Sequence, residues 1–267
     1  LPDVHEDGFM PLVLRLYEQA EDRLQAEGLN IKMVAARGPM VTASWVMGVT
    51  DLMMGLVNHP LETSKFLDTV TTTIINWLHA QLDTIREPEG IMLLDDIVGM
   101  VSLEHYQEFV APRLQRIFDE FEGLIRIFHN DTVCPHLYPA LAEANFDVFN
   151  FTHEVDIAQV KAMMGHRVAL MGNVPPLSVG VRQSAEVVTE WAKTCLDRAA
   201  PGGGMILSVG GGVSPDMPAE NIDALLEAAR TWEKPTAAQI EKIEQEAAAA
   251  LSGTASSERR SRRRRRR

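Results

Sequence analysis

Short apolar runs alternate with longer amphipathic stretches along most of this chain. Six runs rich in β-branched or other apolar residues are short enough for buried strands, at residues 31–36, 91–94, 124–128, 146–151, 168–171 and 205–208. Stretches with helical periodicity separate them, at residues 9–26, 61–85, 103–121, 157–164, 185–199 and 219–231. This alternation predicts right-handed crossovers and a parallel sheet.

Glycine or polar residues follow nearly every predicted strand. They are Arg37-Gly38-Pro39, Asp95-Asp96, His129-Asn130-Asp131, Thr152-His153, Gly172-Asn173 and the glycines at 210–212. A (β/α)8 barrel carries its active face at the carboxyl ends of its strands, and this pattern is typical of one. A doubly wound open sheet usually has a GxGxxG turn after its first strand, which this sequence lacks. We therefore expect an α/β fold of the (β/α)8 TIM barrel class.

Six predicted strands are two fewer than a closed barrel needs, so we expect the barrel to lack strands at its N-terminus. Open strand edges would then favour self-association into a homo-oligomer, with the first and last strands on the two sides of a gap. Past Trp232 the composition shifts to Ala, Glu and Lys. We expect a barrel domain over residues 1–233 and a helical or disordered tail over 234–267, with a linker at 252–257 and a run of arginines at the end.

The charge distribution argues against nucleic-acid binding by residues 1–257, the body of the chain. Eight arginines follow Ser257, and residues 1–257 carry 17 basic against 36 acidic side chains. Phosphate contacts need clustered Lys and Arg, so any affinity for RNA, acidic partners or membranes would belong to the tail. The sequence has no apolar run of 18 residues and no signal-peptide pattern near its first residue, and its two cysteines are too few for a disulfide framework. We expect a cytoplasmic enzyme with no membrane association and with Cys134 and Cys195 reduced.

Two acidic motifs are the main candidates for catalysis. Asp95 and Asp96 close one predicted strand, and one of them is expected to face the barrel mouth because successive strand residues point opposite ways. A carboxylate there can act as a general base or bind a cation, or it can simply cap a helix. His129 and Asp131 end the next strand two residues apart, so both can project to the same side and share a metal ion such as zinc. A histidine in a loop, followed by an aspartate that caps the next helix, would give the same sequence without any metal site.

Further candidates for substrate binding follow other strands. Asn173 offers an amide to orient a substrate, and the glycines around Gly211 let backbone N–H groups approach an anion, although tight turns also need glycine. Met47 belongs to a group of methionines that can line an adaptable pocket, although methionine more often fills a core.

The order of these motifs resembles the uroporphyrinogen decarboxylase superfamily, which includes methyltransferases that serve corrinoid proteins. The resemblance covers residues 31–232. It rests on the Gly38-Pro39 turn, Asp95-Asp96, Ser102 to Tyr106 with Pro112, His129, Gly172 to Pro175, and Pro218 to Ile222.

The resemblance implies different residues for the two branches of the family. In the decarboxylases, Trp45 corresponds to a tyrosine, Asp96 to a serine and Gly211 to a histidine, so all three positions have changed. In the methyltransferases a His-x-Cys pair and a later cysteine hold a zinc ion that activates a thiol. His129 matches this pattern, whereas Asp131 and Gly211 stand at the cysteine positions. The resemblance thus implies an atypical zinc site on His129 and Asp131, with Trp45, Met47, Asn173 and Gly211 near the substrate.

Three functions remain open at this point. The first is a methyltransferase-like enzyme that moves a methyl group between a small substrate or thiol and a partner corrinoid (cobalamin) protein. The second is a carboxy-lyase, a uroporphyrinogen decarboxylase that acts in porphyrin synthesis. The third is a non-catalytic scaffold derived from the barrel.

Overall fold

The computed structural model describes residues 1–265, with side chains up to Ser252. The chain forms two compact units, Leu1–Phe149 and Asn150–Arg267, and each is described by itself. All six predicted strands are present, with ends displaced by up to three residues.

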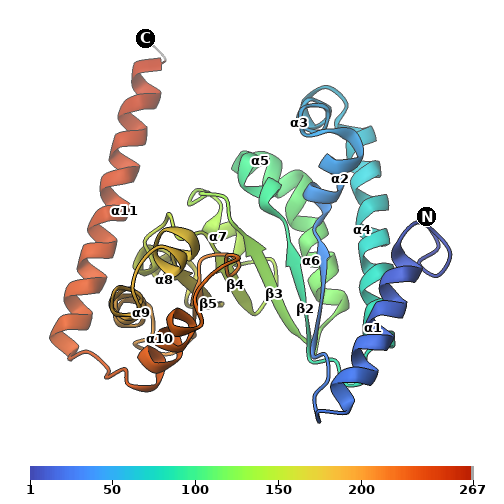
Figure 1. Ribbon diagram of the computed structural model, residues 1–267. Helices are drawn as coiled ribbons and strands as arrows, with labels where there is room; N and C mark the ends of the chain where they lie inside the picture. The colour runs from blue at the N-terminus through green and yellow to red at the C-terminus, as the bar shows by residue number, and fades with distance from the viewer. Residues whose placement is uncertain (266–267) are drawn as a thin grey trace. The chain divides into compact units, whose positions relative to one another are not determined.

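The sheet of unit 1 is parallel. Strand β1 (Met33–Arg37) pairs with β2 (Gly90–Leu94), and β2 pairs with β3 (Ile125–Asn130) (Figure 1). Arg37 lies abreast of Leu94, and Leu94 lies abreast of His129. The carboxyl ends of the three strands therefore meet at one edge. Strand β4 (Val148–Phe151) spans the boundary between the units.

Helices of unit 1 cover the strands and extend beyond their carboxyl ends. Helix α4 (Pro60–Thr84) packs on β1, on α1 (Met10–Gln25) and on α6 (Ala111–Glu120). Helices α2 (Pro39–Met47) and α3 (Val49–Asn58) follow β1, beyond the carboxyl ends of the strands, as Figure 1 shows. An aromatic cluster fills the core beside β3 and α6; its rings belong to Phe118, Phe128, Tyr138, Phe146 and Phe149.

The stretch at 103–121, predicted as one helix, is divided into three parts. A short α5 (Leu103–His105) is followed by a π-helical turn (Tyr106–Val110) and then by α6. Pro112 explains the interruption, because proline lacks the N–H that would bond to the carbonyl of Glu108. The guanidinium of Arg113 donates to that carbonyl instead, over 3.4 Å.

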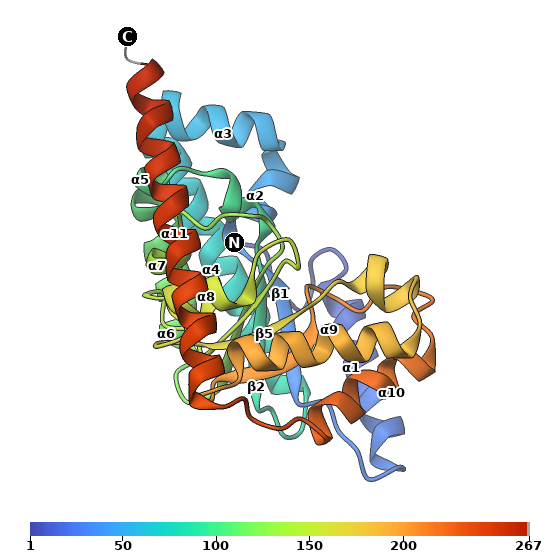
Figure 2. The same cartoon turned by 90° about the vertical axis from the view of Figure 1, so that its left-hand side faces the viewer.

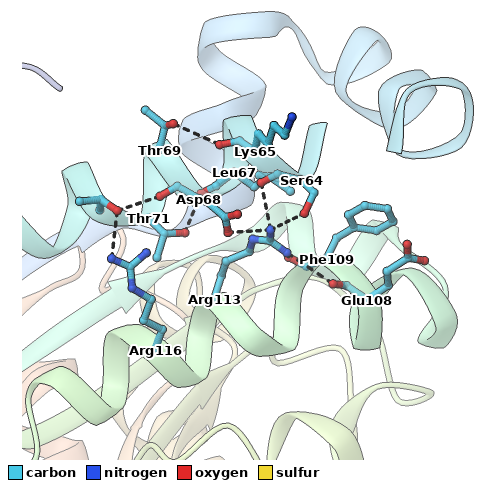
Figure 3. A network of polar contacts seen from close by, with 11 residues as sticks. Ser64, Lys65, Leu67, Asp68, Thr69, Thr71, Glu108, Phe109, Arg113 and Arg116 are labelled. Carbon is cyan, nitrogen blue, oxygen red and sulfur yellow. Dashed lines mark hydrogen bonds and ion pairs between the residues drawn. The ribbon is translucent and has the colours of Figure 1, made fainter. Parts of the chain in front are cut away.

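Arg113 also ties α6 to the start of α4 (Figure 3). Its buried guanidinium donates to the carbonyl of Ser64 over 2.9 Å, to the Ser64 hydroxyl over 2.7 Å and to the Asp68 carboxylate over 2.7 Å. A buried charge is tolerated only when it is paired and hydrogen-bonded, and these contacts pair the two terminal nitrogens' charge, while the Nε of Arg113 has no hydrogen-bond partner among the described residues.

Unit 2 repeats the strand–helix order. It contains α8 (Ile157–Met164), β5 (Ala169–Val174), α9 (Ala185–Ala199), β6 (Met205–Val209) and α10 (Ala219–Arg230), and β5 pairs with β6 in parallel. The buried Asn221 fixes the start of α10, since its amide donates to the carbonyls of Gly180 and Gln183 over 2.8 and 2.9 Å.

Helix α11 (Ala237–Arg265) packs along α8, where Ala247 is buried (Figure 2). It continues through residues 252–257, so the linker predicted there is wrong. After Pro235 the segment has no proline to interrupt the helix. Arg266 and Arg267, the end of the predicted arginine run, lie outside the described residues. The predicted domain boundary after residue 233 stays a prediction, as does the gap between the first and last strands.

Within residues 1–265, no single helix has the length and apolar character needed to cross a membrane; α2 and α3, bent by 105°, reach that length and character only when counted together.

Candidate functional site

Asp95 and Asp96 follow β2 directly and face different neighbours. The fully buried carboxylate of Asp95 accepts hydrogen bonds from the backbone N–H groups of Met40 and Val41, over 2.8 and 2.9 Å. It therefore caps the N-terminus of α2, where unpaired N–H groups and the helix dipole favour an acceptor. A side chain on Gly38 would overlap the Asp95 carboxylate, which explains the glycine in the Gly38-Pro39 turn.

Burial has a large effect on Asp95. It raises the pKa of the Asp95 carboxyl to about 7, against the opposing effect of the backbone N–H groups that it accepts. Both oxygens of its carboxylate accept hydrogen bonds from the first turn of α2. The structural role of Asp95 is therefore to hold that helix on the sheet.

Asp96 turns toward β3 instead. Its Oδ1 accepts from the backbone N–H of Asp131 over 2.7 Å, and its carbonyl accepts from the Thr132 hydroxyl over 2.6 Å. Asn130, fully buried, donates to the carbonyl of Asp95 over 2.8 Å and accepts from the backbone N–H of Thr132. These bonds lock the loop after β2 to the loop after β3, which keeps the site preorganised.

His129 lies between two carboxylates. Its Nε2 is 3.6 Å from Oδ1 of Asp96 and 3.7 Å from Oδ2 of Asp131. The imidazole is buried, whereas the two carboxylates are 38% and 46% exposed. Strand β3 continues to Asn130, two residues further than predicted, so His129 lies within the strand. The structure thus brings Asp96, His129 and Asp131 together in unit 1 and directs Asp95 elsewhere.

The remaining residues of the predicted site lie in different surroundings. Trp45 is exposed on α2, and the Arg37 guanidinium lies 5.6 Å from the centroid of its ring. Arg37 is a cation at the end of β1 that sequence reasoning did not single out; its place directly before Gly38-Pro39 was the available signal. Met47 lines a hollow beside α3.

In unit 2, Asn173 belongs to β5 and its amide is engaged by protein groups. It donates to the carbonyls of Thr152 and Val155 and accepts from the Cys195 thiol. Gly211, after β6, has a φ of 80°, a conformation that favours glycine. The contribution of these two residues to substrate binding stays a prediction.

The predicted zinc site is not matched by thiolate ligands. Both cysteines are free and buried; burial raises the pKa of the Cys134 thiol to about 12 and raises the pKa of Cys195 as well. Neither therefore supplies a thiolate at neutral pH. Among the described residues, no group of three or more His, Cys, Asp or Glu side chains is arranged to hold a metal ion.

Comparisons with known proteins identify the family of this chain. A family model described as uroporphyrinogen decarboxylase (URO-D) matches residues 1–232. Uroporphyrinogen decarboxylase from Mannheimia succiniciproducens is 26% identical over 73% of this chain and 56% of its own length. The enzyme of the same name from Rhodococcus opacus is 32% identical over 63% of this chain and 48% of its own. The chain thus spans about half the length of these curated relatives.

Solved structures show the same fold. A methyltransferase from Methanosarcina mazei superposes with a TM-score of 0.75 at 21% identity, covering 86% of this chain and 66% of that one. A B12-independent methionine synthase from Shewanella superposes with a TM-score of 0.56 at 12% identity, covering 91% and 69%. The α/β barrel class predicted from the sequence is confirmed. With a family model that matches most of its length, the chain belongs to the uroporphyrinogen decarboxylase family.

Proposed function

We propose that this protein is a methyl-transfer enzyme in which His129 acts as the general base. The observation that carries the proposal is the pair of carboxylate oxygens within 3.7 Å of the His129 Nε2 at the ends of two adjacent strands. A thiol substrate would give its proton to that nitrogen and become a nucleophilic thiolate. Asp96 and Asp131 would then stabilise the imidazolium, because opposite charges at this separation favour the charged form.

The methyl group itself needs a second component. A corrinoid held by a partner protein supplies or accepts the methyl group when it is bound. The residues of this chain hold the small substrate and move its proton. Trp45 and Met47 are the proposed substrate contacts in unit 1, and the roles of Asn173 and Gly211 in unit 2 stay predictions. The corrinoid partner, the cytoplasmic location and self-association are parts of the same proposal.

Uroporphyrinogen decarboxylation is the second candidate, and the names of the curated relatives support it. The charge of the site opposes it. A polycarboxylated porphyrinogen would meet Asp96 and Asp131 in a protein whose residues 1–257 include 36 acidic and 17 basic side chains. Like charges repel when they are brought together. A non-catalytic scaffold is the outcome if neither reaction is found.

Zinc does not fit as a thiolate-bound activator here, since no thiolate lies in the site, and no catalytic step is assigned to it. An atypical metal site would depend on the nitrogen of His129 and the oxygens of Asp131, which are weaker ligands for zinc than thiolates.

The test is a direct comparison of the two reactions. Methyl transfer from methylcobalamin to small thiols and decarboxylation of uroporphyrinogen are measured for the wild type and for His129→Gln. We expect methyl transfer in the wild type and a loss of about 10²-fold or more in the variant, the usual contribution of a general base. His79→Gln, which removes an exposed histidine of the same unit, is the control and should leave the rate unchanged. Decarboxylation without methyl transfer would overturn the proposal in favour of the second candidate.

A further inference from the structure

Arg37, the last residue of β1, points to the face of the sheet that lies opposite α4 and α6. Burial alternates along β1: Val34 and Ala36 are buried, whereas Ala35 and Arg37 are exposed. Helix α4 packs on β1 and on α6, so both helices cover the face to which the buried residues point. Because successive strand residues point to opposite faces, the Arg37 side chain lies on the other face.

His129 points to the same face as Arg37. Its neighbour Phe128 has its ring against Phe118 of α6, so the next residue of β3 turns away from that helix. Arg37 lies abreast of Leu94, and Leu94 lies abreast of His129. The three residues form a row across the strand ends, in which the outer two Cα atoms are two strand spacings, or about 10 Å, apart.

The guanidinium of Arg37 is held in place without being neutralised. It lies 5.6 Å from the centroid of the Trp45 ring, a contact that leaves its charge unpaired. It forms no ion pair with any carboxylate in the described part of the chain, although residues 1–257 include 36 acidic and 17 basic side chains. The backbone beside it is fixed, since the N–H of Gly38 donates to the Leu94 carbonyl over 2.8 Å. Arg37 therefore presents a cation from a rigid strand end.

The row has opposite charges near its two ends. Asp96 and Asp131 each have a carboxylate oxygen within 3.7 Å of the His129 Nε2, and the guanidinium of Arg37 belongs to the other end. The two carboxylates repel an anionic group, whereas the guanidinium offers it a planar fork of N–H donors. A small substrate with one negative group is thus oriented with that group at Arg37 and its opposite end at His129.

We propose that Arg37 binds an anionic group of the substrate and so selects acids over their neutral analogues. The guanidinium N–H groups donate to the oxygens of that group while the Trp45 ring supports the guanidinium. The inference rests on the function proposed above, because the other end of the same substrate carries the thiol that gives its proton to His129.

The test compares 3-mercaptopropionate with 3-mercaptopropionamide, which has the same length and the same thiol but no charge. Binding of each to the full chain is measured by titration calorimetry and by NMR at neutral pH. The wild type should bind the acid about tenfold more tightly, as expected for one hydrogen bond to a charged group. Arg37→Gln should abolish this preference by weakening binding of the acid alone. Arg37→Lys should keep part of it, because lysine retains the charge but not the fork.

Arg15→Gln is the matched control, since it removes an exposed arginine on α1 and should leave both affinities unchanged. Equal weakening of the acid and the amide in Arg37→Gln would reduce Arg37 to a packing partner of Trp45 and overturn the proposal. An undiminished preference in that variant, no preference in the wild type, or no binding of the acid at millimolar concentration would overturn it as well.

The measurement separates this inference from the function proposed for His129, because binding is recorded without turnover. A preference for the acid that is lost in Arg37→Gln supports the inference even if no methyl transfer is found. Methyl transfer with equal binding of the acid and the amide contradicts the inference alone.

Discussion

Asp95 and Asp96 are identical neighbouring residues, yet they differ in burial and in the groups that they contact. The first is fully buried and bonded to the start of α2, and the second is partly exposed beside His129. The sequence predicted that only one of them faces the barrel mouth, because successive residues leave a strand in opposite directions. It did not say which one, since that depends on where α2 begins.

The first prediction concerns the pH dependence of stability. In the folded protein, burial raises the pKa of Asp95 to about 7, against about 3.9 in an unfolded chain. Between these values the unfolded state releases its proton and the folded state keeps it. This group's contribution to the free energy of unfolding therefore falls as pH rises from about 4 to 7, by up to about 1.4 kcal/mol per pH unit.

The measurement is chemical denaturation across that range for the wild type and for Asp95→Asn, which cannot titrate. The stability of the wild type relative to the variant should decline toward pH 7. A rise in relative stability over the same range would mean that the two backbone hydrogen bonds outweigh desolvation and hold the pKa of Asp95 down.

A second prediction at this scale concerns metal content. Zinc bound to the purified protein should be lower in Asp131→Ala than in the wild type, because a site without thiolates cannot lose an oxygen ligand and keep its affinity. Elemental analysis after dialysis against zinc measures the difference. Equal zinc in both proteins would remove Asp131 from any metal site.

At the scale of elements, Pro112 and Arg113 decide how α6 begins. Proline leaves the Glu108 carbonyl without its helical donor, and the next residue supplies one while reaching across to Ser64 and Asp68 on α4 (Figure 3). The sequence predicted a single helix here because apolar periodicity continues through the interruption. The proline was visible, but the guanidinium that replaces its hydrogen bond comes into place only when α4 packs on α6.

The third prediction follows from this contact. Arg113→Met should destabilise the protein by about 2–4 kcal/mol, because it leaves the buried carbonyl of Phe109 and the part-buried carbonyl and hydroxyl of Ser64 without their donor. Arg116→Met, one turn further along α6, removes an exposed arginine with a single bond to the Thr72 hydroxyl and should cost less than about 0.5 kcal/mol. Thermal or chemical unfolding of both variants measures the difference. Similar losses in the two variants would show that burial of Arg113 does not matter.

At the scale of the whole molecule, charge is divided between the body and the last residues. Residues 1–257 are strongly acidic, and eight arginines follow them. We predict that the full chain is retained on immobilised heparin at low salt and released as salt rises, because the arginines exchange with counterions. A variant that ends at Ser257 should pass through unretained. Retention of the shortened variant would locate a basic surface on the body itself.

Alternation of apolar runs and amphipathic stretches was enough to predict the six strands, most of the helices and the barrel class, because strand and helix periods are local properties of a sequence. The motifs after the strands also predicted that His129, Asp131 and one of two aspartates would be neighbours, since parallel strands end at one edge. Tertiary structure alone decided that Asp95 caps α2, that both cysteines are buried thiols and that Arg113 completes a helix interrupted by proline. Each of these features depends on contacts between residues of different helices and strands. Those contacts set the burial, the hydrogen-bond partners and the pKa of each group.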